Sequence, residues 1–291
     1  MFKRYFITLL LLLGAGSVIA HFYQIYNQHP WTRDGRVNAH IISITPRVTG
    51  QITHIYVEDN SHVKEGELLF EIDDSLYQAA YHKAMASQSQ EQAVLERALN
   101  EDKRANDLQK RTPGSVPVLT LNNLSNTVTS ARASLELARA GVEEAKLNLQ
   151  YTKVYAPTDG FLTSFNLRIG SHAMANTPVV ALIDANSFWV EGYFKETDLE
   201  GVAPNDKAFV TLLMDSDRVF DAQVQSIGFG IAKQDGLKGN ELLPNINPNF
   251  QWIRLAQRIP VKVTFKALPT DFQLRVGMTA SIKVIKQSVE H

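Results

Sequence analysis

The clearest pattern of hydrophobic positions in the chain lies between residues 121 and 149. Apolar side chains recur there in alternating steps of three and four residues, at Leu121, Leu124, Val128, Ala131, Leu135, Ala138, Val142, Ala145 and Leu149. A seam of this period over about four heptads is typical of a helix that pairs with another helix in a coiled coil. The pattern therefore predicts a long helix with one apolar edge.

A second helical segment, about residues 75 to 111, precedes it with a weaker seam. One edge can be filled by Tyr77, Ala80, Ala84, Val94, Ala98, Ala105 and Leu108. Polar residues interrupt that edge at Ser87, Glu91 and Glu101. The two segments together predict an antiparallel α-helical coiled-coil hairpin over residues 73–150, with arms roughly 50 Å long at 1.5 Å per residue.

Both ends of the first helix carry recognisable signals. An N-cap signal is provided by Asp73, Asp74 and Ser75, because short polar side chains accept hydrogen bonds from the first free backbone N–H groups. Breaks in the helical pattern come at Pro113, Gly114 and Pro117, so the tip of the hairpin is expected near residues 112–118.

The hairpin is flanked by two segments that read as short β-strands broken by Gly, Asp and Asn turns, residues 41–72 and 151–184. Neither segment is large enough to bury a core by itself. We therefore expect the two segments to fold together as one β-module that the hairpin interrupts, and the family resemblance described below implies that the module is lipoyl-like. True lipoyl domains carry a lysine on the turn that the hairpin replaces, and Lys64 is predicted to be a surface residue without a cofactor.

The rest of the chain, residues 185–291, predicts a small antiparallel β-barrel with a C-terminal strand. Alternating strands are expected near residues 188–194, 208–213, 222–227, 261–265 and 280–284. Gly and Pro residues predict a long loop at about 231–251. Residues 28–40 read as a polar linker. The overall prediction is an α+β fold.

The first 27 residues predict a membrane anchor. Lys3 and Arg4 precede an apolar run from Tyr5 to Ala20 that continues into aromatic residues up to Tyr26. About 20 apolar residues span a bilayer, and basic residues favour the cytoplasmic side. The alternative is a signal peptide cleaved after Ala20. Either interpretation exports the rest of the chain, and the first predicts a single-pass inner-membrane protein whose bulk lies in the periplasm.

Composition excludes several classes of function. The 29 basic and 30 acidic residues give a net charge of −1, which argues against a nucleic-acid partner. The chain has no cysteine, so disulfides and thiolate chemistry are excluded. The eight histidines show no metal-ligand spacing, and no nucleophile elbow, phosphate loop or dinucleotide fingerprint is present. We therefore expect no enzymatic activity, cofactor or metal.

The order of these segments, with Val63-Lys64-Glu65-Gly66, Ala156-Pro157-Thr158-Asp159-Gly160 and Arg275-Val276-Gly277-Met278, resembles the periplasmic adaptor (membrane-fusion, HlyD-type) family. The opening, residues 29–35, is similar to that of adaptors for p-hydroxybenzoic acid (aromatic carboxylic acid) exporters. The resemblance implies an adaptor that links an inner-membrane exporter to an outer-membrane TolC-type channel, as a homo-oligomer of three or six copies. Alternatives are an adaptor for a multidrug major-facilitator or ATP-driven exporter, and a periplasmic ligand-binding module.

The family carries an Arg, a Leu four residues on and a Ser seven residues beyond near its hairpin tip, where it is thought to meet the channel. Arg104, Leu108 and Ser115 have this spacing, so the resemblance implies that they contact the outer-membrane channel. The plainer alternative makes Arg104 a solvated charge, Leu108 a seam residue and Ser115 part of a turn. The two prolines that bracket Ser115 depart from the family pattern.

Overall fold

The computed structural model describes residues 13–17, 29–165, 167–230, 256–267 and 272–286. The chain forms two compact units, one of residues 41–184 and the other of residues 1–40 with 185–291. Most of the predicted anchor and the predicted loop at 231–251 lie outside the described residues. Residues 13–17 are helical. Within the described part of the chain, no helix combines the length and hydrophobicity needed to cross a membrane.

The first unit contains a β-module of two four-stranded antiparallel sheets. The first half of the chain supplies β2 (Ile41–Ile44), β3 (Gly50–Ile55), β4 (His62–Val63) and β5 (Leu68–Ile72). The second half supplies β6 (Lys153–Tyr155), β7 (Gly160–Thr163), β8 (His172–Ala173) and β9 (Val180–Asp184). The strand orders are β2-β9-β7-β4 and β6-β5-β3-β8, so each sheet takes strands from both halves. The predicted split module is confirmed.

The core of the β-module is likewise shared between the two halves. Phe70 and Leu69 from the first half and Leu162 and Leu182 from the second half are fully buried in one cluster. Leu182 is also the strand partner of both Ile42 and Leu162. Burial of apolar surface is the main stabilising contribution to folding, and neither half retains this core without the other.

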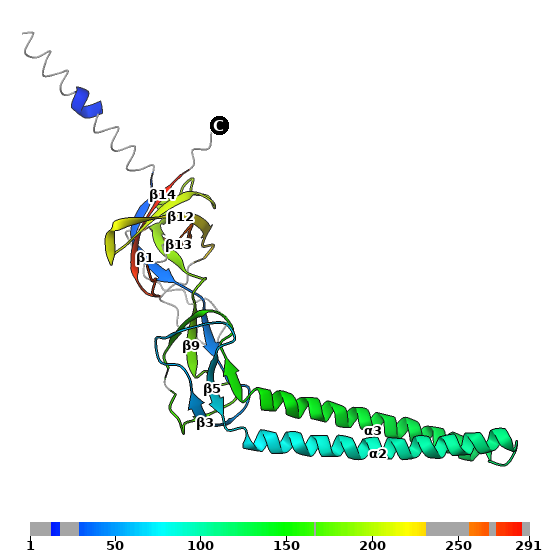
Figure 1. Cartoon of the computed structure of the whole chain (residues 1–291). Helices are drawn as coiled ribbons and strands as arrows, with labels where there is room; N and C mark the ends of the chain where they lie inside the picture. The colour runs from blue at the N-terminus through cyan, green and yellow to red at the C-terminus, as the bar shows by residue number, and fades with distance from the viewer. Residues whose placement is uncertain (1–12, 18–28, 166, 231–255, 268–271, 287–291) are drawn as a thin grey trace, which may run out of the picture. The chain divides into compact units, whose positions relative to one another are not determined.

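Between β5 and β6 the chain forms two long helices, α2 (Ser75–Arg111) and α3 (Val118–Gln150). They lie side by side as a hairpin (Figure 1). Strands β5 and β6 are themselves paired, with Glu71 opposite Lys153. The N–H of Ile72 donates to the carbonyl of Thr152 at 2.8 Å, so the two ends of the hairpin are held together at its root.

The predicted seam of α3 is confirmed. Val128, Ala131 and Leu135 are buried between the helices, together with Leu95 and Ala98 of α2, and the remaining predicted seam positions of α3 are half-buried. Only these five side chains form the buried core of the hairpin. The contact is therefore a narrow line, as expected for a two-helix coiled coil.

The predicted seam of α2 is partly wrong. Val94 and Leu108 are exposed at 37% and 49%, and Ala80 is exposed as well. One edge of α2 is formed by side chains that are buried or half-buried, namely Tyr77, Tyr81, Ala84, Gln88, Glu91, Leu95, Ala98, Asp102, Ala105 and Gln109. Their spacing alternates strictly between four and three, so this seam is a regular heptad that carries several polar residues.

The second unit is a closed antiparallel barrel with the strand order β1-β10-β13-β12-β11-β14. Its strands are β1 (Trp31–Asn38), β10 (Trp189–Lys195), β11 (Lys207–Leu212), β12 (Asp215–Ile227), β13 (Arg258–Phe265) and β14 (Thr279–Ile285). The predicted barrel and its five strands are confirmed. The prediction of a linker over residues 28–40 is wrong, because β1 closes the barrel between β10 and β14.

The composition of strand β1 is unusual for a strand, so the sequence does not predict it. Its sequence contains Arg33, Asp34, Gly35 and Asn38, residues that are mostly depleted in strands. Gly35 is required by packing, since a β-carbon there would lie 2.6 Å from the carbonyl oxygen of Ala280 on β14. The inward side chain of Val37 is fully buried in the barrel core.

Candidate docking site at the hairpin tip

The tip of the hairpin is a compact turn built by local hydrogen bonds. The N–H of Thr112 donates to the carbonyl of Leu108 at 2.8 Å, and the N–H of Ser115 donates to the carbonyl of Thr112 at 3.2 Å. Gly114 has a φ of +85°, a conformation that favours glycine. The N–H of Val116 donates to the side-chain oxygen of Gln109 at 3.1 Å. These contacts satisfy backbone groups that helix ends leave free.

The three residues implied by the family resemblance all lie at this end of the hairpin. Arg104 and Leu108 are one turn apart on α2, a spacing that places them on the same helix face, and Ser115 lies in the turn beyond. All three are exposed. With 49% of its surface exposed, Leu108 is not a seam residue, which removes one plain alternative. Whether these side chains contact a channel remains a prediction.

Two further apolar side chains at the tip were missed in the sequence. Val118 and Leu119 begin α3 directly after Pro117 and are 70% and 71% exposed. The sequence does indicate that both are exposed, because neither residue lies at a seam position when the heptad is continued backward from Leu121. With Leu108 they give the tip three large exposed apolar side chains, which is the kind of surface that marks a protein contact.

Arg104 also belongs to a charged groove along α2. The Nε of Arg104 donates to the carbonyl of Asn100 at 3.2 Å, so the side chain lies back along its own helix. An open groove of about 670 Å³ is lined by Ala93, Glu96, Arg97, Asn100, Lys103, Arg104 and Asp107. The groove mixes both signs of charge on one solvated helix face. It therefore suits a polar protein contact better than an apolar ligand.

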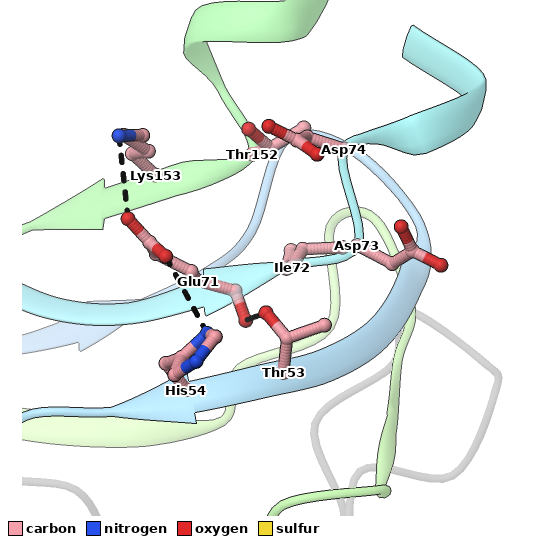
Figure 2. Close-up of a pocket in the computed structure, with 8 residues that line it drawn as sticks. All are labelled: Thr53, His54, Glu71, Ile72, Asp73, Asp74, Thr152 and Lys153. Carbon is pink, nitrogen blue, oxygen red and sulfur yellow. Dashed lines mark hydrogen bonds and ion pairs between the residues drawn. The ribbon is translucent and has the colours of Figure 1, made fainter. Parts of the chain in front are cut away.

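The root of the hairpin carries a second cluster, on the outer surface of β3, β5 and β6 (Figure 2). One oxygen of the Glu71 carboxylate is 3.3 Å from the Nζ of Lys153, and the other is 3.6 Å from the Nδ1 of His54. The hydrogen bond that Lys153 donates to Glu71, followed by the charge of that carboxylate, raises the pKa of Lys153 above its ordinary value. The adjoining hollow of about 180 Å³ also includes Thr53, Asp73 and Thr152.

The root cluster fixes the start of the hairpin. Asp73 accepts hydrogen bonds from the hydroxyl and the N–H of Ser75, at 2.7 and 3.0 Å, and these bonds lower the pKa of Asp73. Of the predicted capping residues, Asp74 directly precedes the helix and its side chain makes no cap hydrogen bond, whereas Asp73 accepts from the N–H of Ser75, the first helical residue. Carboxylates near a helix N-terminus also complement its dipole. Every charge here is engaged in strand or helix contacts.

Two further contacts between the β-module and the helical hairpin, the root clamp, hold the hairpin at its root. The hydroxyl of Tyr77 on α2 donates to the carbonyl of Thr49 at 2.7 Å. The guanidinium of Arg47 lies 4.6 Å from the ring centre of Tyr151, directly after α3, within the range of a cation–π contact. Among the described residues, no three His, Cys, Asp or Glu side chains are grouped as metal ligands.

Comparison with known proteins supports the same architecture. The chain is 35% identical over 281 residues to the protein YdhJ of Escherichia coli (strain K12), covering 97% of each. Residues 40–185 match the family profile described as "RND MFP, barrel-sandwich hybrid domain". The chain belongs to the periplasmic adaptor, or membrane fusion protein, family. Residues 187–285 of this adaptor match the profile of the AAEA-like beta-barrel domain.

Solved membrane fusion proteins share the fold of this adaptor. The membrane fusion protein Spr0693 from Streptococcus pneumoniae R6 matches with a TM-score of 0.63 and 16% identity, over 89% of this chain and 99% of that one. A MacA-MexA chimeric protein that contains the Pseudomonas aeruginosa MexA alpha-hairpin domain matches with a TM-score of 0.61 and 22% identity, over 89% and 81%. At these identities the likeness concerns the fold alone.

Proposed function

We propose that this adaptor is the periplasmic subunit of a tripartite efflux pump, in which it joins an inner-membrane exporter to an outer-membrane channel of the TolC type. Family membership supports the general role, since adaptors of this family bind inner-membrane transporters and outer-membrane channels, form oligomers and are not enzymes. The observation that carries the proposal is the hairpin, inserted between the paired strands β5 and β6 and bearing exposed apolar side chains at its tip.

In this proposal Arg104, Leu108 and Ser115 form the channel contact, extended by Val118 and Leu119. Leu108 and its two apolar neighbours lose water on contact, and Arg104 supplies a charge for orientation. The N-terminal segment of residues 1–27 anchors the adaptor in the inner membrane, with the bulk of the chain in the periplasm. Three or six copies are needed because one two-helix hairpin does not enclose a conduit.

The barrel is a poor site for a small ligand, which argues against the binding-module alternative. Its interior is filled by buried side chains of the six strands, among them Val190, Phe194, Val210, Val263 and Ile282. Small closed barrels whose interiors are packed in this way serve as rigid cores. We therefore assign the barrel to protein and membrane contacts.

The channel contact is tested by reversing the charge of Arg104. Because the chain has no cysteine, Ser115→Cys provides a unique cross-linking position at the tip. We expect Arg104→Glu to lower cross-linking to the channel, and efflux, by about tenfold, equivalent to about 1.4 kcal/mol. Arg132→Glu, at an exposed position on α3, is the matched control. Equal cross-linking and efflux in the two variants would rule out the contact.

The exported compound is proposed from the opening segment, residues 29–35, which is similar to adaptors of p-hydroxybenzoic acid exporters. We infer that the partner pump exports aromatic carboxylic acids. Deletion of the gene is expected to sensitise cells to p-hydroxybenzoate, with recovery on complementation. Sensitivity to structurally unrelated drugs, with unchanged tolerance of p-hydroxybenzoate, would instead assign the adaptor to a multidrug or ATP-driven exporter.

A further inference from the structure

Three neighbouring strands of the barrel place aromatic and basic side chains in one row on the outer surface. Trp31 on β1 is the strand partner of Lys283 on β14, and Lys283 is in turn the partner of Phe209 on β11. Directly opposed residues in antiparallel strands point to the same face. Trp31 is 42% exposed, Lys283 is exposed and Phe209 is half-buried.

Two more cations extend this row. The guanidinium carbon of Arg33 lies 5.3 Å from the ring centre of Trp31, and the Nζ of Lys207 lies 5.0 Å from the ring centre of Phe209. We name these five residues, Trp31, Arg33, Lys207, Phe209 and Lys283, the basic–aromatic row. It carries three positive charges, and on β12 it ends at Asp221, the next strand partner of Phe209.

The row lies close in the chain to the segment that we propose as the membrane anchor. Trp31 follows Tyr26, the last aromatic residue of that segment, by five residues. Five residues span at most about 18 Å when fully extended. An anchor that ends at the outer surface of the bilayer therefore holds Trp31, and the row that begins with it, within reach of the lipid headgroups.

The composition of the row matches that environment. Tryptophan is enriched at membrane–water interfaces, where its ring lies at the level of the headgroups. Lysine and arginine near the surface are attracted by anionic phospholipids, and this attraction falls off within a Debye length. Trp31, flanked by Arg33 and Lys283, therefore combines an aromatic contact with the headgroup region and a charge contact with anionic phospholipids.

We propose that the basic–aromatic row docks the barrel onto anionic phospholipid headgroups of the periplasmic leaflet of the inner membrane. This inference rests on the proposed function, because it requires the N-terminal segment to be a retained anchor. The docked row gives the barrel a second attachment beside the anchor, so that it is held against the membrane and does not swing freely on a short tether.

The test uses the full chain in lipid nanodiscs, either of phosphatidylcholine alone or with one third phosphatidylglycerol. A fluorophore is attached through Ser281→Cys, an outward position on β14 two residues from Lys283, and a headgroup spin label on the lipid quenches it. We expect quenching to be at least twofold stronger in the anionic discs. The excess should disappear at high salt and in the Lys207→Glu/Lys283→Glu variant.

The control variant is Lys262→Glu/Lys266→Glu, which makes the same change of charge on the β13 side of the barrel. Strand β13 lies three places from β14 in the closed strand order, and this variant is expected to keep the excess quenching. Equal quenching in both kinds of disc, equal loss in both variants, or quenching that appears only when the exporter is added would each overturn the inference.

Co-elution of the protein with the discs is measured before quenching. If the chain does not remain with the discs, the anchor is wrong, and the inference and the membrane part of the proposed function fail together. If the chain co-elutes with the discs but its quenching is independent of lipid charge, only the inference fails. Tip cross-linking to the channel is a separate readout that neither outcome changes.

Discussion

The β-module and the helical hairpin belong to one unit of the chain, yet they are stabilised in different ways. Fifteen buried residues from both halves form the core of the β-module, whereas the longer hairpin buries only five. The module is a three-dimensional core and the hairpin is a line of contacts. The stable β-module can therefore support a hairpin whose outer helix faces and tip remain exposed and accessible to partner proteins.

The largest loss of stability is expected from a substitution in the core of the β-module. Phe70→Ala removes a fully buried ring and is expected to lower the free energy of unfolding of this module by about 3–5 kcal/mol. Urea unfolding followed by segment-resolved hydrogen exchange measures the loss, since it separates the two units. The barrel should be unaffected, and loss of protection throughout the chain would show that the units do not unfold separately.

The seam of α2 provides the next test, with neighbouring residues as a matched pair. Leu95 is 8% exposed and Val94 is 37% exposed. We expect Leu95→Ala to destabilise the hairpin by about 2 kcal/mol, and Val94→Ala to change it by less than about 0.5 kcal/mol. Amide exchange in α2 and α3 is the measurement. Similar effects of the two substitutions would contradict the observed seam.

The root clamp should contribute less than the seam. Tyr77→Phe removes the hydroxyl that donates to the carbonyl of Thr49 while keeping the ring, and we expect a loss of about 1 kcal/mol. The effect should appear as faster exchange in the first turns of α2, with the middle of the hairpin unchanged. Tyr81→Phe, which removes the hydroxyl of the next seam tyrosine, is the control. Equal exchange in both variants would show that the clamp is unimportant.

The smallest effect is expected at the cap, and it should depend on pH. Hydrogen bonds from Ser75 lower the pKa of Asp73 below its ordinary value of 3.8. Its stabilisation is therefore fully present above pH 3.8 and is lost as the pH falls through the lowered pKa. Asp73→Ala should increase fraying of the first turn at neutral pH, measured by amide exchange.

The same substitution should make progressively less difference as the pH falls below 3.8. Asp74→Ala is the comparison, because the carboxylate of Asp74 accepts from the side chain of Gln78 and not from a backbone N–H. A difference between Asp73→Ala and the unsubstituted protein that stays constant down to strongly acidic pH would show that the ionised carboxylate is not the cap.

The sequence predicted the split module, the hairpin and the barrel because each has a strong local period or a paired set of turns. The predictions from sequence were wrong where tertiary contacts determine the structure of a segment. Strand β1 carries Asp34 and Gly35, and only its neighbours in the barrel make it a strand. In α2, Val94 and Leu95 are both apolar, so hydrophobicity alone does not reveal which one faces α3.

The candidate site was predictable only in part, for similar reasons. The family spacing located Arg104, Leu108 and Ser115 at the tip, and their exposure agrees with that position. Val118 and Leu119 lie outside the heptad seam of α3, so the periodic pattern does not mark them as part of the tip surface. The basic–aromatic row depends on the register of three strands that are distant in the chain, and no local pattern contains it.

The paired strands at the root of the hairpin have a consequence for how this protein fits its partners. Because β5 and β6 are neighbours, the chain leaves and re-enters the β-module at almost the same place. Adding seven residues to each helix would lengthen the spacer by about 10 Å while keeping every seam position in phase. Evolution or design can thus change the length of the hairpin in whole heptads, without altering a single strand.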